Sequence, residues 1–326
     1  MTHYRLHLDE PLPDGVRRIF TGLTGDIVTR LDDPSADTVA NDVHEARKLC
    51  KKARGLARLV RPALGDAYHR INHRYRDAAR RLAPIRDPQA MLGTFDDLVL
   101  ADAALVPDDG LEAVRSTLAE RAASATEAVL GGERDRLTDA RRLAEAGLAE
   151  AERVSVPDRF DPAGGGVRKT YKRGRNRLHD VLEAPAVEGF HEWRKRVKYL
   201  WYQVRLLQDR APSMLRPYRR RLHDLSDALG DAHDLALIAE AVRADEDLPP
   251  AERDALGVMA DGRRADLEDR AVRLGARLYV EDPDRLVDRF EGYWDAASLG
   301  PERPAGEIAD LFDGGDAEAA GVVAAG

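Results

Sequence analysis

Apolar residues recur every three or four positions along most of this chain, whereas alternating runs of β-branched residues hardly occur. The first pattern is that of an amphipathic helix, and the second would indicate a half-buried strand. The sequence therefore predicts an all-α protein. Breaks at Pro and Gly separate the expected helices, which span 14–31, 37–61, 66–83, 86–105, 108–130, 132–154, 166–183, 187–209, 213–229, 232–245, 249–278 and 283–297.

An internal repeat accompanies this pattern. The segment VHEARKLCKKARGLARLV at 43–60 matches FHEWRKRVKYLWYQVRLL at 190–207, with a shift of 147 residues. The same shift carries Arg74 to Arg221, Leu82 to Leu229 and Asp87 to Asp234. Self-similarity at a fixed offset indicates a duplicated structural unit. We therefore expect two homologous halves, each a bundle of about four to six helices.

The repeat suggests how the chain is divided. We expect one region over 8–297, made of a first half at 8–154, a linker at 155–165 and a second half at 166–297. The linker region leads into PAGGGVRK, which could cradle a phosphate, although glycine-rich runs are more commonly linkers. The segment at 298–326 has no helical periodicity, and we expect it to be disordered.

Composition limits the kind of anion site that the chain can form. The net charge is −8, so basic residues that bind an anion must be gathered locally against an acidic background. The single cysteine, Cys50, fits a reducing compartment. The chain shows neither a signal peptide nor an apolar run of about 20 residues. We therefore expect a soluble, cytoplasmic protein that does not span a membrane.

Both copies of the repeat predict a helix with one basic and one apolar face. At about 100° per residue, five basic residues of the first copy fall within about 80° of His44. We call the first basic rail the set His44, Arg47, Lys48, Lys51, Arg54 and Arg58. The second basic rail is His191, Arg194, Lys195, Lys198 and Arg205, and Tyr202 is predicted on the same face.

Such rails are unfavourable beside water alone, because like charges three or four residues apart repel by a few tenths of a kcal/mol per pair. Only Glu45 and Glu192 interrupt them. The chain has 44 arginines but seven lysines, and every lysine lies in a basic helix, at 48, 51, 52, 169, 172, 195 and 198. An ammonium acts as a point charge beside the bidentate fork of arginine. The rails therefore indicate a binding site for a multiply charged anion. The alternative interpretation is a basic helix face that contacts only solvent.

Other segments add positive charge to the expected site. The helix over RKTYKRGRNRLH places on one side Arg168, Lys169, Lys172, Arg175, Asn176 and His179. The helix over HRINHRYRDAARR groups Arg70, His73, Arg74 and Arg81, and the second half offers Arg220 and Arg221 at the matching place. The aromatic residues that could stack against bases are few, namely Tyr171, Trp201 and Tyr202.

Motifs of common enzymes and metal sites are missing from the sequence. HEARK and HEWRK resemble the start of HExxH, but Lys48 and Lys195 stand at the second zinc-ligand position. The sequence has no GxxxxGK[ST] loop and no paired acidic clusters for Mg²⁺. No nucleophile or carboxylate pair accompanies the histidines, so an acid–base role in catalysis is not indicated. We expect the histidines to act as hydrogen-bond donors on the basic face, where a bound polyanion would raise their pKa. Asp87 and Asp234 are expected either to orient basic side chains or to cap helices.

The two His-x-x-Arg-Lys-x-x-Lys helices, with RKTYKRGRNRL before the second copy, resemble the CHAD family, the conserved histidine α-helical domain. The resemblance covers residues 8–297. It implies an all-α fold of two pseudo-symmetric helical bundles around a basic central groove or pore. It also implies non-catalytic binding of inorganic polyphosphate, possible association with polyphosphate granules, and no cofactor or metal.

Carried over position by position, the resemblance implies polyphosphate contacts at both rails and at further basic residues. The rail contacts are His44, Arg47, Lys48, Lys51, Arg54, Arg58, His191, Arg194, Lys195, Lys198 and Arg205. The further contacts are Arg70, Arg74, Arg168, Lys169, Lys172, Arg175 and Arg221. In the second copy Trp201 replaces Arg54, so the two halves need not contribute equally.

Three other functions remain open at this point. RNA or DNA could bind through its phosphates, because phosphate contacts alone do not identify the polymer. A phosphate-transfer enzyme would need an acidic metal site, which the sequence does not offer. A helical scaffold could hold an acidic protein tail on the same basic face.

Overall fold

The structure is a computed structural model, and it describes residues 4–107 and 110–299. Within these residues the chain forms α-helices and short 3₁₀ helices without any strand, so the all-α prediction is confirmed. The first elements are α1 (Leu12–Arg30), α2 (Val39–Leu59), α3 (Arg61–Leu64), α4 (Ala67–Arg81), α5 (Ala83–Ala101), η1 (Ala103–Leu105), α6 (Glu112–Gly131) and α7 (Asp135–Glu152). They are followed by α8 (Asp161–Glu183), α9 (Val187–Leu207), η2 (Gln208–Arg210), α10 (Pro212–Arg243), α11 (Pro250–Leu278) and α12 (Pro283–Ser298).

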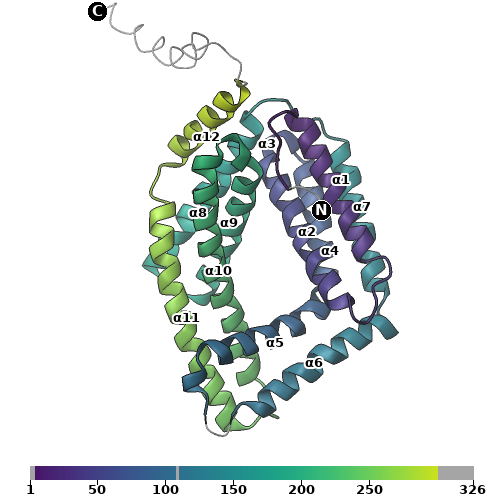
Figure 1. Ribbon diagram of the computed structural model, residues 1–326, viewed down its shortest axis with the longest axis vertical. Coiled ribbons are helices and arrows are strands. Elements are labelled where there is room, and N and C mark those ends of the chain that lie inside the picture. The colour runs from purple at the N-terminus through teal and green to yellow at the C-terminus, as the bar shows by residue number, and fades with distance from the viewer. Residues whose placement is uncertain (1–3, 108–109, 300–326) are drawn as a thin grey trace, which may run out of the picture.

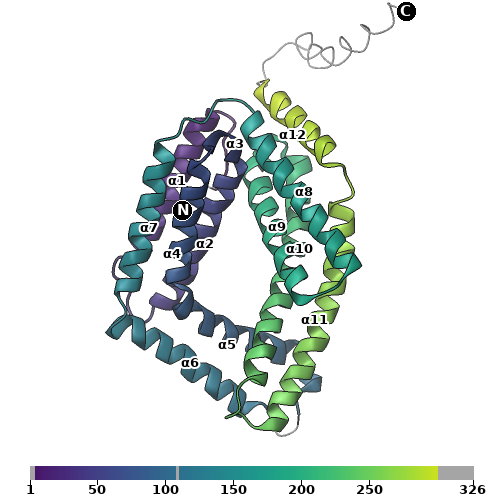
Figure 2. The ribbon, with the colours of Figure 1, turned by 180° about the vertical axis from the view of Figure 1, so that it is seen from behind.

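The helices form two limbs (Figure 1). One limb holds α1, α2, α4 and α7, and the other holds α8 to α12. Helices α5 and α6 cross from one limb to the other at the lower end, where α5 packs against α10. Figure 2 shows from behind that α8 lies beside α9 on the second limb. None of the helices in the described ranges is long and apolar enough to cross a membrane.

The limbs meet where α2 packs against α9 and α8. A Cβ at Gly55 would lie 2.9 Å from Tyr202 Cβ, so the absence of a side chain lets α2 and α9 approach closely. Near the chain start, the Leu6 amide donates to the Leu206 carbonyl over 3.0 Å, and the Tyr4 hydroxyl donates to the Lys52 carbonyl over 2.9 Å. These contacts fix the two rail helices side by side.

The apolar faces predicted for α2 and α9 are confirmed. Buried residues of α2 recur with the helical period and include Ala46, Leu49, Cys50, Ala53, Leu56 and Ala57. In α9 they include Val197, Leu200, Val204 and Leu207. The position of Tyr202 was predicted wrongly: its ring is 1 % exposed, because it packs against Gly55 and Tyr4 in the junction between the limbs.

The glycine-rich segment is helical, so the predicted linker at 155–165 is wrong in its second part. Helix α8 begins at Asp161, with Pro162 in its first turn, where the missing N–H of proline costs nothing. A Cβ at Gly166 would lie only 1.9 Å from the Leu59 carbonyl oxygen. Close helix packing, rather than chain flexibility or a phosphate loop, therefore explains these glycines.

The second correction concerns α10, which was predicted as two helices at 213–229 and 232–245. It is one helix from Pro212 to Arg243, and the LGDAHD segment lies inside it. Contacts with α9 and α11 along its length outweigh the low helix propensity of Gly230. In the first half the corresponding break is real, because α4 ends at Arg81 and α5 begins at Ala83. Asp87 and Asp234 lie within helices and cap neither.

A shift of 147 residues relates several observed helix bounds. It carries α2 to 186–206, where α9 spans 187–207, and it carries α7 to 282–299, where α12 spans 283–298. This agreement is compatible with two homologous halves, and the duplication stays a prediction. Of the tail predicted to be disordered at 298–326, residues 300–326 lie outside the described part of the chain.

Candidate anion-binding surface

The middles of the two rails face each other where α2 and α9 meet. Lys51 is half-buried, and its pKa falls to about 7 because of burial and then because of Lys198, Arg47 and Arg194. Burial also lowers the pKa of Lys198, and Arg194 adds to this effect. Neither lysine has an ion-pair partner within 4.0 Å among the described residues. Asp234 acts on both lysines and Asp227 on Lys198, but without an ion pair, and the lowered pKa values show that the surrounding basic residues and burial outweigh these acids.

Arg194 contributes an unsatisfied donor to the same place. Its Nε atom is buried and has no hydrogen-bond partner among the described atoms. A buried N–H group without an acceptor is unfavourable by about 1–3 kcal/mol, and more when it carries charge. The guanidinium lies against Gly230 of α10, where a Cβ would stand 3.6 Å from Nε, so this donor is enclosed by the packing of α9 on α10.

Several cations that precede Lys51 and Lys198 in the rails, unlike these two lysines, form ion pairs with acidic side chains. Glu45 accepts from Lys48 over 3.0 Å, and Glu192 occupies the same position beside Lys195. Asp87 of α5 accepts from Arg47 over 2.7 Å, which confirms the expectation that this carboxylate orients a basic side chain. An anion would compete with these acids for the paired cations, whereas beside Lys51 and Lys198 it would raise the lowered pKa of each amine and favour its charged form.

The rail histidines are held neutral by their surroundings. Burial lowers the pKa of His44, and Arg86, which donates to His44 Nδ1 over 2.9 Å, lowers it further. His191 and His233 of α10 approach with 3.1 Å between their Nδ1 atoms. Burial and then the neighbouring His191 lower the pKa of His233 to about 3. Because the basic residues around them oppose protonation, a bound polyanion would shift these histidines toward the charged form.

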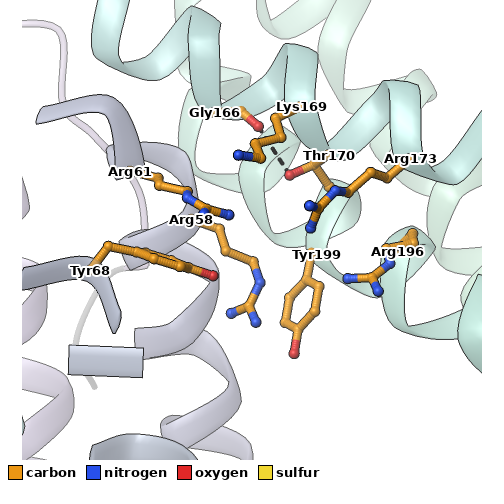
Figure 3. Close-up of a pocket in the computed structure, with 9 residues that line it drawn as sticks. All are labelled: Arg58, Arg61, Tyr68, Gly166, Lys169, Thr170, Arg173, Arg196 and Tyr199. Carbon is orange, nitrogen blue, oxygen red and sulfur yellow. Dashed lines mark hydrogen bonds between the residues drawn. The ribbon is translucent and has the colours of Figure 1, made fainter. Parts of the chain in front are cut away.

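A basic cavity lies at the C-terminal end of the first rail (Figure 3). It has a volume of about 50 Å³. We call it the junction cavity, and its lining is Arg58, Arg61, Tyr68, Gly166, Lys169, Thr170, Arg173, Arg196 and Tyr199. Five of these side chains are cationic and none is acidic. The polar ends drawn in Figure 3 converge from α2, α3 and α4 on one side and from α8 and α9 on the other.

Two tyrosines hold the arginines of the cavity in position. The guanidinium of Arg58 lies 3.6 Å from the centroid of the Tyr199 ring, and Arg61 lies 4.3 Å from that of Tyr68. Arg58 also donates to the Arg54 carbonyl over 2.9 Å. Cation–π contacts orient a guanidinium without neutralising it. The arginines are therefore fixed in place and keep their charge for a ligand.

The charges in the junction cavity oppose one another. Burial lowers the pKa of Lys169, and the nearby Arg61 and Arg173 lower it further. Burial likewise lowers the pKa of Arg173, with Arg196 and Arg61 as the next causes. Among the five cations only Arg196 forms an ion pair with a residue of the described ranges, namely Glu192 at 3.3 Å. An anion in the cavity would relieve this repulsion.

Several predicted site residues lie apart from the rails. Arg70 pairs with Glu150 of α7 over 2.9 Å, Arg168 pairs with Asp284 of α12, and Arg221 pairs with Asp224 over 3.3 Å. Exposed positions that do not line the junction cavity are Arg74, Lys172 and Arg175. Lys169 is the one member of the further predicted contacts that lines the cavity.

A second basic cluster lies on another side of the rails. Lys52 is about 120° around α2 from Arg58. Burial lowers the pKa of Lys52, and Arg205 of the second rail lowers it further. The Arg205 guanidinium lies 5.7 Å from the Tyr4 ring and 5.9 Å from Trp201. Lys52 and Arg205 therefore form a basic cluster on a different side of the junction between the limbs from Arg58.

The few aromatic residues that the sequence offered as stacking platforms for bases are inaccessible. Tyr171, Trp201 and Tyr202 are 0 %, 9 % and 1 % exposed, so even these few candidates are closed to a base. Sequence reasoning also missed cavity-lining residues, namely Arg61, Tyr68, Arg173, Arg196 and Tyr199. Arg196 and Tyr199 stand beside rail residues in the sequence, and a helical wheel places Arg196 about 140° from His191 and Tyr199 about 80° from it, at the edge of the rail face. Their role depends on the approach of α8 and α9 to α2 and α3.

The chain was compared with known protein families. The CHAD domain matches residues 23–243, which include both rails and the junction cavity. No curated protein matches the chain. The family match covers more than half of the sequence and agrees with the all-α fold and the paired basic helices. The chain therefore belongs to the CHAD family.

Proposed function

We propose that this protein binds inorganic polyphosphate between its two basic rails and does so without catalysing a reaction. The observation that carries the proposal is that Lys51 and Lys198, two half-buried lysines from different halves, each have a pKa lowered by burial and neighbouring cations, with no carboxylate of the described residues within 4.0 Å, although Asp234 lies near both and Asp227 near Lys198. Like charges in partly buried surroundings are unfavourable unless an anion accompanies them. A bound polyanion would therefore stabilise this arrangement of lysines.

A linear polyphosphate suits the rails because it carries regularly spaced negative charge. Successive basic residues of one helix face lie one turn, about 5.4 Å, apart along the axis. An unbranched chain of phosphates can follow such a row and contact several cations in turn. Counterions released from the polymer would supply much of the affinity, so binding should weaken steeply as salt rises.

RNA and DNA are the nearest rivals, because their phosphates would meet the same cations. Two features favour polyphosphate. Tyr68 and Tyr199 lie against the guanidinium groups of Arg61 and Arg58, so their ring faces are engaged. The other aromatic residues near the rails are buried. The surface therefore has many phosphate-binding groups and few platforms on which bases could stack.

The cellular setting follows from the proposed ligand. We propose that the protein acts in the cytoplasm and associates with polyphosphate granules through this surface. An acidic protein tail would be a weaker competitor, because its carboxylates are spaced less regularly than the phosphates of a chain. A phosphate-transfer activity is proposed to be absent, and phosphate release that depends on Mg²⁺ would contradict this.

The test is a titration of the whole chain with long-chain polyphosphate, with RNA as competitor, at about 150 mM salt. We expect tight binding that an equal concentration of RNA phosphate does not displace. Repeating the titration at several salt concentrations gives the number of phosphate contacts from the slope, about 0.7 per contact for a single-stranded polymer. Equal displacement by RNA would reduce the surface to a general polyanion site, and absence of binding would overturn the proposal.

A further inference from the structure

We propose that a bound polyphosphate chain continues from the first rail through the junction cavity and then along helix α8. This inference rests on the proposed function, because it assumes that the rails bind one stretch of the same chain. The residues assigned to the second stretch are Arg61, Lys169, Arg173, Asn176, Arg177 and Arg196, and we call them the α8 groove.

Two neighbouring cavities form the α8 groove. The junction cavity is open to solvent and shares two of its lining residues, Arg173 and Arg196, with a second and larger cavity. The other lining residues of the second cavity are Asn176, Arg177 and Asp180. Figure 3 shows the two shared side chains entering from α8 and α9. A polymer that reaches the junction cavity therefore meets further basic side chains beyond it.

One face of α8 carries a row of cations. Lys169, Arg173 and Arg177 follow one another at intervals of four residues, so they lie within about 80° of one another around the helix. All three are exposed, and the row is about 12 Å long. A linear polyanion can therefore contact these side chains in turn, as it would those of a rail.

Most of the positive charge in the α8 groove has no acidic partner. Arg196 pairs with Glu192 over 3.3 Å. Within the described ranges, no ion pair forms at Arg61, Lys169 or Arg173, and the pKa of Lys169 is lowered by burial and then by the two arginines. Like charges so close together are unfavourable beside water alone. A polyanion in the α8 groove would offset this repulsion.

Arg58 connects the first rail with the α8 groove. It belongs to the rail, and its side chain lines the junction cavity. Its guanidinium lies 3.6 Å from the Tyr199 ring centroid and 6.0 Å from that of Tyr68, while Arg61 contacts the Tyr68 ring at 4.3 Å. No acidic side chain lines the cavity between them. The cations of the rail and of the α8 groove therefore form one continuous path.

Acidic residues mark the far end of this path. Figure 2 shows α8 leading from the neighbourhood of α3 down the second limb. Farther along α8, Asp180 accepts from Arg177 over 2.7 Å, and Glu183 pairs with His179 at 3.4 Å. These carboxylates oppose a polyanion. We therefore expect the second bound stretch to end near Asp180.

The test measures Kd for polyphosphates of defined, increasing length. Continuation along α8 predicts that the affinity of the unaltered protein keeps rising after the rails are filled, until the chain also fills the α8 groove. Short chains that lose binding in Lys51→Glu with Lys198→Glu are bound by the rails. These chains provide the reference for binding without the α8 groove.

Two variants locate the gain from longer chains. Lys169→Gln with Arg173→Gln removes two unpaired cations of the α8 groove, and we expect it to bind long chains about tenfold or more weakly. The salt slope for long chains should fall by about 1.4, at about 0.7 per lost contact, and the short reference chains should keep their Kd. Arg270→Gln with Arg277→Gln removes the same charge from exposed positions of α11 and should match the unaltered protein at every length. Circular dichroism checks that both variants fold.

The outcomes separate this inference from the proposed function. Equal binding of long chains by the unaltered protein and the α8-groove variant would overturn the continuation along α8 and leave the proposed function standing. A loss that is the same at every chain length, or that also occurs in the α11 variant, would show a general effect of charge and would overturn it too. If no chain binds the unaltered protein, both proposals fail.

Discussion

Arg58 of α2 stacks on Tyr199 of α9, with 3.6 Å between the guanidinium carbon and the ring centroid. The contact joins the two limbs and marks the point where the first rail enters the junction cavity. A neutral ring orients the guanidinium and leaves its charge for a ligand. This arrangement links the packing between the limbs to the proposed binding of polyphosphate.

Replacing Tyr199 should weaken polyphosphate binding. In Tyr199→Leu the Arg58 guanidinium loses its support, and we expect a loss of about 1 kcal/mol, a roughly fivefold rise in Kd. Tyr199→Phe keeps the ring and should retain the affinity. Isothermal titration calorimetry measures both. Equal affinity of the leucine and phenylalanine variants would show that the stack contributes nothing to binding.

Lys51 should make stability depend on pH. Its pKa is about 7 in the folded protein and about 10.4 in an unfolded chain. Between these values the unfolded state binds more protons, so stability rises with pH across this window. The unfavourable effect of burying the charge is complete below pH 7 and disappears near pH 10.4.

The Lys51→Met variant tests this dependence. At pH 6 we expect its Tm to be about 2 °C or more above that of the unaltered protein, corresponding to about 1 kcal/mol. The gap should close as pH approaches 10. Lys172→Met, at an exposed position, provides the control and should show no such trend. Parallel Tm curves for Lys51→Met and the unaltered protein would contradict the assignment.

Gly166 should be essential for the junction between the limbs. Gly166→Ala places a methyl group against the Leu59 carbonyl, and we expect a loss of about 3 kcal/mol in the free energy of unfolding. Gly25→Ala is the matched control, because nothing lies within 4 Å of its Cβ in α1. That change should stabilise by about 0.5–1 kcal/mol. Urea denaturation measures both, and similar effects of the two substitutions would refute the packing role.

Removing an acid beside the first rail should strengthen binding. Asp87→Asn releases Arg47 from its 2.7 Å ion pair, and we expect a gain of about 0.5–1 kcal/mol, a two- to fivefold lower Kd for polyphosphate. Asp96→Asn removes an acid of the same helix that pairs with Arg115 over 3.0 Å, and it should leave Kd unchanged. An equal gain in both variants would indicate a general charge effect.

The sequence alone predicts the helices and faces that a local pattern controls. The apolar period of α2 places Leu49, Cys50 and Ala53 in the core, and these residues are buried. Like charges on the opposite face identify the rails, including Lys51 and Lys198. Both features depend on residues within one helix, so no knowledge of the neighbouring helices is needed to find them.

What the sequence does not predict depends on contacts between helices. Glycines typical of a linker are helical at Gly166, because α2 approaches α8 closely there. Gly230 lies inside α10 rather than at a break, because α9 and α11 support that helix. The junction cavity combines residues of five helices, so Arg173 and Tyr199 could not be assigned to it from their own segments.

The most direct test of the account reverses the two lysines that meet between the rails. We expect Lys51→Glu with Lys198→Glu to weaken polyphosphate binding at least about 30-fold at 150 mM salt, because two acids would stand where the anion lies, at a cost of about 2 kcal/mol or more. Arg270→Glu with Arg277→Glu makes the same change of charge at exposed positions of α11 and should leave Kd within about twofold. With helicity unchanged in both, a selective loss in the lysine variant supports the rails as the binding site. Wild-type affinity in that variant, or an equal loss in the two, would contradict it.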